Sequence, residues 1–209
     1  MDTVNRALRR VPTWAVYALG GLPLVWLIWE AVANTLGPNP VEAIEHRLGL
    51  LGLQFLIASL CITPLRWAGL NLIRYRRALG LLAFGYVALH LLTWVVLDRA
   101  LRWDEIIADL YKRPYIIIGM VGFLALLPLA LTSNSRAIRA MGAAAWGRLH
   151  QLAYVAAVAG ALHWLVLVKR WPPEPLIYAG IVAALLLARV IAKRGPGWLS
   201  LWISRPKAG

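Results

Sequence analysis

Cysteine is nearly absent from this sequence of 209 residues, because the chain holds one, Cys61, inside an apolar run. A single cysteine cannot form an internal disulfide, and it cannot supply the clustered thiolates of a zinc or iron–sulfur site. We interpret Cys61 as a packing residue. The chemistry of this protein must therefore come from other residue types.

Acidic residues are also scarce, since nine Asp and Glu stand against 22 Lys and Arg and give a formal net charge of +13 with a pI near 10.9. Nucleic-acid binders carry such an excess, but they gather it on one water-facing surface. Here the basic residues are spread between long apolar runs. This distribution argues against nucleic acid as a partner and indicates charged flanks of membrane spans.

A third absence concerns nicotinamide cofactors. No strand pattern followed by a glycine-rich dinucleotide loop occurs in the sequence, and about 15 residues follow the last apolar run. We therefore expect that this chain does not bind and oxidise NADPH by itself. Any electrons that it carries must be delivered by another molecule.

Apolar residues dominate the composition, at 61% against 15% charged, which is too hydrophobic for an ordinary soluble domain of this length. Six apolar runs are each long enough for a spanning helix of roughly 20 residues. They cover about 14–33, 46–65, 79–97, 115–132, 147–168 and 176–192. The third, fifth and sixth runs lack the polar–apolar alternation of barrel strands, and we find no internal repeat. The sequence predicts an all-α, polytopic membrane helix bundle with six transmembrane helices.

The connections between the runs differ in charge. Fifteen Lys and Arg lie on the side that holds both termini, whereas seven lie on the opposite side and are diluted by seven acidic residues. Cytoplasmic connections are enriched in Lys and Arg, so we expect both termini to face the cytoplasm. The predicted organisation is a cytoplasmic N-terminal tail at 1–13, a six-helix transmembrane domain at 14–192 and a cytoplasmic C-terminal tail at 193–209.

Two histidines lie at matched depth in the membrane. His90 and His163 each sit roughly 9–12 Å below the outer boundary, on the third and fifth runs, which cross in the same direction. They could face each other and supply two axial nitrogens to one haem iron. A stripe of small residues before His163, formed by Gly160, Ala159 and Ala156, would give a flat macrocycle room. The alternative is that the small residues only allow close helix packing.

The other candidate residues lie away from this pair. His150 is expected near the cytoplasmic boundary, about 20 Å from His163 on the same helix, where it would suit a second redox centre, although an ideal helix turns the two about 140° apart. The arginines Arg76 and Arg77 could bind haem propionates or a flavin phosphate, or they could be topology charges. His46 is interpreted as an interfacial histidine rather than a ligand.

Several short motifs occur in an order and spacing that resemble one bacterial family. They are Thr63-Pro64-Leu65-Arg66, Arg77-Ala78-Leu79-Gly80-Leu81, Leu89-His90-Leu91, Lys112-Arg113-Pro114-Tyr115, Pro128-Leu129-Ala130-Leu131-Thr132-Ser133, Trp146, Leu149-His150, Tyr154 and His163. Together they resemble the MsrQ (YedZ) family, the haem-binding membrane subunits of the bacterial periplasmic methionine sulfoxide reductase system. The segments before the first run and after Gly195 match least.

This resemblance implies a ferric-reductase-like transmembrane fold in the bacterial inner membrane, with haem b and flavin mononucleotide (FMN) as cofactors. It implies that electrons pass from the quinone pool, or from a cytoplasmic flavin reductase, to a periplasmic molybdenum-cofactor catalytic subunit that repairs oxidised methionines. By this resemblance His90 and His163 are the axial haem ligands and His150 is a further haem-associated histidine, so that one haem is expected and a second is left open. The chain would be an electron-transfer subunit rather than the catalytic one.

Two other classes of protein fit parts of the pattern. A self-contained ferric reductase or a quinone-linked cytochrome b would share the helix core, but the reductase usually carries a fused flavin and nicotinamide domain. A transporter would also use intramembrane histidines, together with acidic residues at the midplane and helices broken by Gly or Pro in matching halves. Among the acidic residues only Glu30 comes close, and it lies near an outer end of its run.

Overall fold

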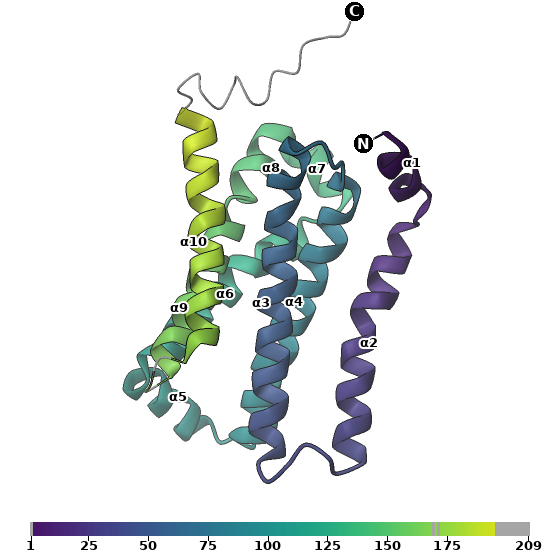
Figure 1. Cartoon of the computed structure of the whole chain (residues 1–209). Coiled ribbons are helices and arrows are strands. Elements are labelled where there is room, and N and C mark those ends of the chain that lie inside the picture. The colour runs from purple at the N-terminus through teal and green to yellow at the C-terminus, as the bar shows by residue number, and fades with distance from the viewer. Residues whose placement is uncertain (1, 169, 171, 195–209) are drawn as a thin grey trace, which may run out of the picture.

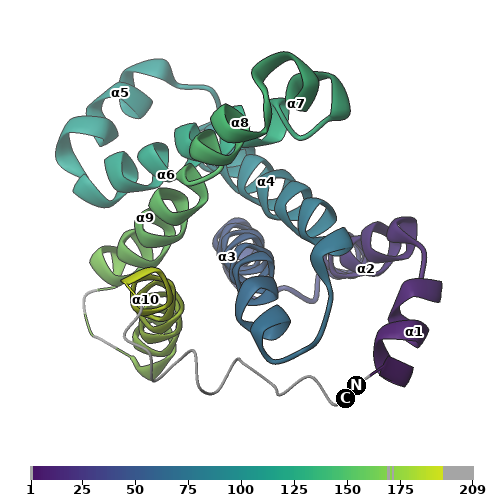
Figure 2. The same cartoon turned by 90° about the horizontal axis from the view of Figure 1, so that it is seen from above.

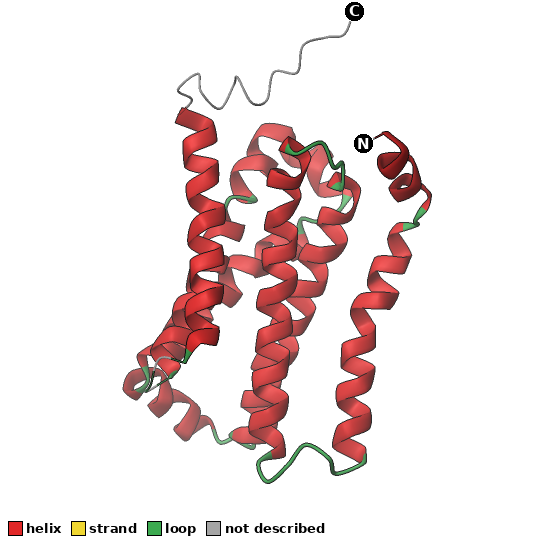
Figure 3. Cartoon of the chain, viewed as in Figure 1, coloured by secondary structure: helices red, strands yellow, loops and turns green. Residues whose placement is uncertain are grey.

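The structure is a computed structural model that describes residues 2–168, 170 and 172–194. Every regular element in this part of the chain is helical (Figure 3). The elements are α1 (Asp2–Arg10), α2 (Thr13–Val32), α3 (Pro40–Trp67), η1 (Ile73–Tyr75), α4 (Arg76–Thr93), η2 (Trp94–Asp98), α5 (Trp103–Lys112), α6 (Pro114–Leu131), α7 (Ser135–Met141), α8 (Ala143–Leu149), α9 (Leu152–Leu167) and α10 (Pro173–Arg194). The predicted all-α fold class is confirmed.

Six helical segments among the described residues are long and apolar enough to cross a membrane. They are Thr13–Val32, Pro40–Trp67, Ile73–Asp98, Pro114–Leu131, Ala143–Leu167 and Pro173–Ala192. Pro40 and Pro114 stand at the start of α3 and α6, where proline is favoured because its missing N–H would have no helical partner. The predicted count of six spans is confirmed. Helix α3 begins at Pro40, ahead of its apolar run, because the polar residues before that run are helical as well.

Helix α3 lies at the centre of the bundle, with α2, α4, α9 and α10 around it (Figure 1 and Figure 2). The most extensive helix pairs are α3 with α4 and α6 with α9. The core joins leucines of α3, including Leu53 and Leu56, to alanines of α9, including Ala156 and Ala157. Small side chains on α9 allow the close helix approach that membrane bundles depend on.

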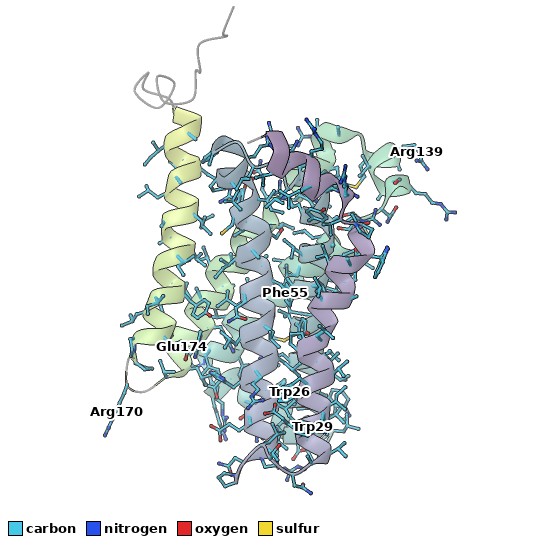
Figure 4. The ribbon with its side chains drawn as sticks, turned by 45° about the vertical axis from the view of Figure 1, so that its right-hand side comes forward. Trp26, Trp29, Phe55, Arg139, Arg170 and Glu174 are labelled. Carbon is cyan, nitrogen blue, oxygen red and sulfur yellow. The ribbon has the colours of Figure 1, made fainter. Side chains whose placement is uncertain are left out.

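The outward surface of the bundle is apolar, as α2 illustrates. Trp26 is 59% exposed and Trp29 is 54% exposed, with their rings 4.8 Å apart. Figure 4 labels both in the half of α2 that leads into the α2–α3 connection. A surface of this kind would be an aggregation-prone patch in water, whereas it is the ordinary lipid-facing surface of a spanning helix. The chain is therefore a multi-pass membrane protein.

The N-terminal residues form a short helix that is attached to the α3–α4 connection. Asn5 Nδ2 donates to Gly69 O at 2.9 Å, and Asn5 Oδ1 accepts from the backbone N–H of Asn71 at 2.9 Å. The hydroxyl of Tyr75 donates to Val11 O at 2.8 Å. Helix α1 and the last described turn of α10 lie at the same end of the bundle (Figure 1). The assignment of this end to the cytoplasm stays a prediction, and residues 195–209 of the predicted C-terminal tail lie outside the described part.

A buried arginine compensates for a proline inside α3. Pro64 has no N–H, so the carbonyl of Leu60, four residues earlier, loses its helical donor. Arg189 on α10, which is 6% exposed, donates Nη2 to that carbonyl and Nη1 to Leu185 O at 2.9 Å. Its guanidinium also lies 5.4 Å from the centre of the Tyr154 ring. Arg189, which the sequence places among the charges flanking the last run, is thus a structural residue inside the bundle.

This pairing predicts coupling between Arg189 and Pro64. Substituting Arg189→Met leaves the buried Leu60 carbonyl without a donor, which costs about 1–3 kcal/mol. In a Pro64→Ala background the new N–H of residue 64 restores that hydrogen bond, so the cost of Arg189→Met should be smaller by about this amount. Unfolding of the four proteins in detergent measures the difference. Equal costs of Arg189→Met in both backgrounds would show that the two residues act independently.

Helix α5 connects the third and fourth spans outside the membrane-spanning segments. The backbone before it reverses through two left-handed residues, Ala100 with φ 46° and Leu101 with φ 60°, a conformation that costs roughly 1–2 kcal/mol for a residue with a Cβ atom. The helix buries Ile106 and Asp109 and exposes Trp103. Figure 1 places α5 at the end of the bundle that also holds the α2–α3 connection.

Candidate functional site

Two histidine rings face each other in the half of the bundle next to α5. His90 lies near the end of α4 and His163 near the end of α9. Their ring centroids are 6.1 Å apart and their planes are inclined at 81°. The structure thus brings together the two residues that the sequence placed at one depth.

Each ring is oriented by a backbone carbonyl of a neighbouring helix. Nδ1 of His90 lies 2.9 Å from Glu45 O on α3, and Nδ1 of His163 lies 2.6 Å from Tyr115 O on α6. A carbonyl oxygen can only accept, so each Nδ1 carries the hydrogen and donates it. In the neutral imidazole the lone pair is then on Nε2, the tautomer that binds a metal through Nε2.

Glycines make room for both rings. A Cβ atom at Gly49 on α3 would lie 3.2 Å from His90 Nδ1, and one at Gly119 on α6 would lie 2.8 Å from His163 Nδ1. Each glycine stands four residues after the residue whose carbonyl accepts from that ring. Any larger residue at Gly119 would require the His163 ring to move, because real Cβ atoms do not approach a neighbour that closely.

The two helix pairs around the site therefore share one local arrangement. Gly49 and Gly52 of α3 face α4, and a Cβ atom at Gly52 would lie 2.7 Å from Val87 Cγ2. Gly119 and Gly122 of α6 face α9, and a Cβ atom at Gly122 would lie 3.3 Å from Ala159 Cβ. The sequence showed no repeat because the correspondence consists of a few residues on each helix. The spacing Gly-x-x-Gly in both spans was the available signal.

The rings border a largely apolar cavity between α3, α4, α6 and α9. Its walls include Leu53, Leu56, Leu126, Ala156 and Gly160, and it encloses about 1300 Å³, counting its open mouth. Ala156 and Gly160, two of the three residues of the predicted small stripe, thus line this cavity. Ala159 is not part of the wall, because it packs against Gly122 instead.

The arrangement suits a metal held in a planar macrocycle. Metal–imidazole bonds are about 2 Å long and half a ring adds about 1 Å, so two rings bound to opposite sides of one iron have centroids about 6 Å apart. The observed separation is 6.1 Å. Among the described residues no group of three or more His, Cys, Asp or Glu could hold a bare metal ion. The two imidazoles could therefore hold the iron of a haem, whose macrocycle would supply the remaining ligands.

Comparisons with known proteins place the chain in a family. The family model described as "Ferric reductase like transmembrane component" matches residues 47–161. A protein of Brucella anthropi, named protein-methionine-sulfoxide reductase heme-binding subunit MsrQ, is 50% identical over 179 residues, which cover 85% of this chain and 81% of the relative. Its namesake in Brucella ovis is 50% identical over 178 residues, which cover 85% of this chain and 80% of the relative. The chain belongs to the MsrQ family.

In this MsrQ family member His150 lies outside the cavity between His90 and His163. Helix α8 ends at Leu149 and α9 begins at Leu152, so the predicted angle along one ideal helix does not apply. The His150 ring stacks on Trp146 at 3.7 Å, and its buried Nδ1 has no hydrogen-bond partner among the described residues. Trp146 is itself fixed, because Nε1 donates to Thr132 O at 3.1 Å.

The arginines Arg76 and Arg77 stand at the first positions of α4, at the opposite end of that helix from His90. Neither lines the histidine cavity. Arg76 is half-buried, and its carbonyl lies 3.4 Å from the Ser59 hydroxyl, whereas Arg77 is exposed. Any contact of these arginines with a cofactor therefore concerns a site near His150, and their role stays a prediction.

The residues at the mouth of the cavity were not identified from the sequence as site residues. His46 lines the mouth with its ring 5.5 Å from that of Trp164, and its interpretation as an interfacial histidine rather than a ligand stays a prediction. Arg113 and Tyr115 also line it. The Lys-Arg-Pro-Tyr motif is among those that resemble the MsrQ family. The motif does not indicate which of its side chains faces the cavity.

An ion-pair network joins α5 to the mouth of the cavity. Asp109, which is 7% exposed, lies 2.9 Å from Arg99 Nε and 3.0 Å from Arg113 Nε. Arg113 Nη1 donates to the Tyr115 hydroxyl at 3.0 Å. This hydrogen bond raises the pKa of Arg113 above its ordinary value, and the carboxylates of Asp109 and Asp98 act in the same direction. Arg113 is therefore a permanent positive charge at the mouth.

Proposed function

We propose that this chain is a membrane electron carrier that holds one b-type haem between Nε2 of His90 and Nε2 of His163. The observation that carries the proposal is the pair of facing rings, each held by a backbone carbonyl and bordering an apolar cavity. The names of the Brucella relatives support it, since they describe heme-binding subunits. A bound haem would supply reversible one-electron chemistry at its iron.

The residues of the chain hold and insulate this centre. The carbonyls of Glu45 and Tyr115 fix the tautomer and the orientation of the rings, which raises their basicity toward a metal. Leucine and alanine side chains exclude water from the cavity and keep the surroundings apolar. Burial and fixed hydrogen bonds of this kind set the potential of a haem.

The proposed electron acceptor is a periplasmic molybdenum-cofactor catalytic subunit of the methionine sulfoxide reductase system, in line with the names of the relatives. The proposed donors are the quinone pool or a cytoplasmic flavin reductase. In this orientation both termini are cytoplasmic in the bacterial inner membrane, as the basic connections favour. The histidine pair then lies near the periplasmic side, which shortens the distance to an acceptor there.

A second centre is proposed at the cytoplasmic end, where His150, Arg76 and Arg77 lie. The unpartnered buried Nδ1 of His150 supports a ligand at this end, as do the arginines at the start of α4. FMN or a second haem would suit these groups, because guanidinium groups bind phosphates and propionates through paired hydrogen bonds.

Electron transfer to the partner tests the function directly. The purified protein, reduced by dithionite and freed of excess reductant, is mixed in a stopped-flow instrument with the oxidised periplasmic catalytic subunit. We expect the haem bands to reoxidise faster than without the subunit, and the rate to rise with its concentration. Haem that reduces ferric chelates but not the subunit would favour a self-contained reductase. A protein that stays free of haem after expression with ample haem would point to transport.

A further inference from the structure

Apart from His90 and His163, the ionisable side chains that line the cavity lie at its mouth, the end next to α5. Glu45, His46, Asp98, Arg113 and Tyr115 lie there, whereas the deeper walls are apolar. The two propionates are the only charged groups of a haem, and a charge without a partner is costly in an apolar environment. A haem bound by His90 and His163 would therefore direct its propionates toward this mouth.

The charges at the mouth include two carboxylates. Asp98, and Glu45 in its ionised form, would repel a propionate. Arg113 is the permanent cation among the residues that line the described cavity. The mouth can therefore accept an anionic group only where Arg113 offsets the two acids.

Arg113 is also held in place and has free donors. Asp109 and Tyr115 engage Nε and Nη1, and a guanidinium has five N–H donors in all. The remaining donors suffice for a carboxylate, which arginine binds through paired hydrogen bonds. Its side chain is 43% exposed, so it can reach an incoming group without a large rearrangement.

We propose that Arg113 binds a propionate of the haem held by His90 and His163, and so favours the reduced form of that haem. This inference rests on the proposed function and names a binding residue for it. Arg76 and Arg77 cannot serve this haem, because fourteen helical residues separate Arg76 from His90, a rise of about 21 Å. Arg99 is occupied by Asp98, Glu105 and Asp109.

The sign of the effect follows from electrostatics. Reduction adds a negative charge to the haem, so a nearby cation stabilises the reduced form. Removing the charge of Arg113 should lower the midpoint potential. The same residue is connected to an axial ligand, because Arg113 donates to the Tyr115 hydroxyl and the Tyr115 carbonyl accepts from His163.

Potentiometric titration of Arg113→Gln tests this assignment, with Lys112→Gln as the matched control. Lys112 is the adjacent residue, is exposed and does not line the cavity. We expect Arg113→Gln to lower the equilibrium ratio of reduced to oxidised haem by about tenfold at a given potential. For one electron this is a decrease of about 59 mV in the midpoint potential. Lys112→Gln should shift the potential much less, because its charge is screened by solvent. Equal potentials in wild type and Arg113→Gln, both with haem bound, would overturn the assignment.

A second variant covers the case in which Arg113→Gln does not fold or retain haem. Arg113→Lys keeps the charge and loses the paired donors of the guanidinium. We expect its potential to stay close to that of wild type and the resonance Raman bending band of the propionates to shift. An unshifted band would overturn the assignment while leaving the haem ligands in place. Absence of haem from the wild-type protein would instead overturn the proposed function.

Discussion

Substituting His163→Ala is expected to abolish the low-spin b-type haem spectrum of this protein, and His90→Ala is expected to do the same. Each removes one of two axial ligands, and the structure offers no substitute imidazole at either position, since the next histidine, His46, lies at the mouth. Losing only a hydrogen-bond partner of a metal-bound histidine costs roughly 10–100-fold in metal affinity. Losing the ligand should cost more, so we expect little haem to survive purification.

The measurement is a pyridine haemochrome count with reduced-minus-oxidised spectra on each purified variant. His46→Ala is the matched control, because this residue borders the same cavity but its ring contacts the Trp164 ring rather than a helix carbonyl. It should keep the haem and the low-spin bands. A normal spectrum in either His90→Ala or His163→Ala would show that the pair is not the ligand set.

Adding one methyl group at Gly119 is expected to loosen the haem markedly, although less than the loss of His163 itself. The Cβ atom of Gly119→Ala would lie 2.8 Å from His163 Nδ1, so the ring must move away from the Tyr115 carbonyl. That carbonyl orients the ring, and its loss predicts a decrease in haem affinity of roughly 10–100-fold. Transfer of haem to excess apomyoglobin measures the change as a faster dissociation.

Two further glycines make this prediction quantitative. At Gly49 the added Cβ would lie 3.2 Å from His90 Nδ1, so Gly49→Ala should have a smaller effect of the same kind. Gly85 lies on α4 with nothing within 4 Å of an added Cβ, so Gly85→Ala should leave haem dissociation unchanged. If Gly119→Ala released haem as slowly as Gly85→Ala, the contact between α6 and the His163 ring would not control the site.

Much of the fold could be predicted from the sequence, because lipid simplifies the choice of structure. Every spanning segment must satisfy its own backbone, so hydropathy and length were enough to give six helices. The depth of His90 and His163 followed from helical rise and the ends of the apolar runs. That the two rings face each other needed a packing arrangement, which the structure supplies.

Other features could not be read from residue types. The partners of both histidines are backbone carbonyls, and every residue has one, so Glu45 and Tyr115 carried no signal. Arg189 was counted as a flanking charge because its role depends on a proline in another helix. The interruption between α8 and α9 lies in a stretch without proline, and it changed the expected relation of His150 to His163.

The electron paramagnetic resonance spectrum of the oxidised wild-type protein tests the central claim most directly. Two imidazoles on one ferric iron give a low-spin signal, and ring planes inclined at 81° predict that it is strongly anisotropic. A low-spin signal of this kind, at about one haem per chain for the His90–His163 site, would support the account. A high-spin signal, or protein without haem after expression with ample haem, would contradict it.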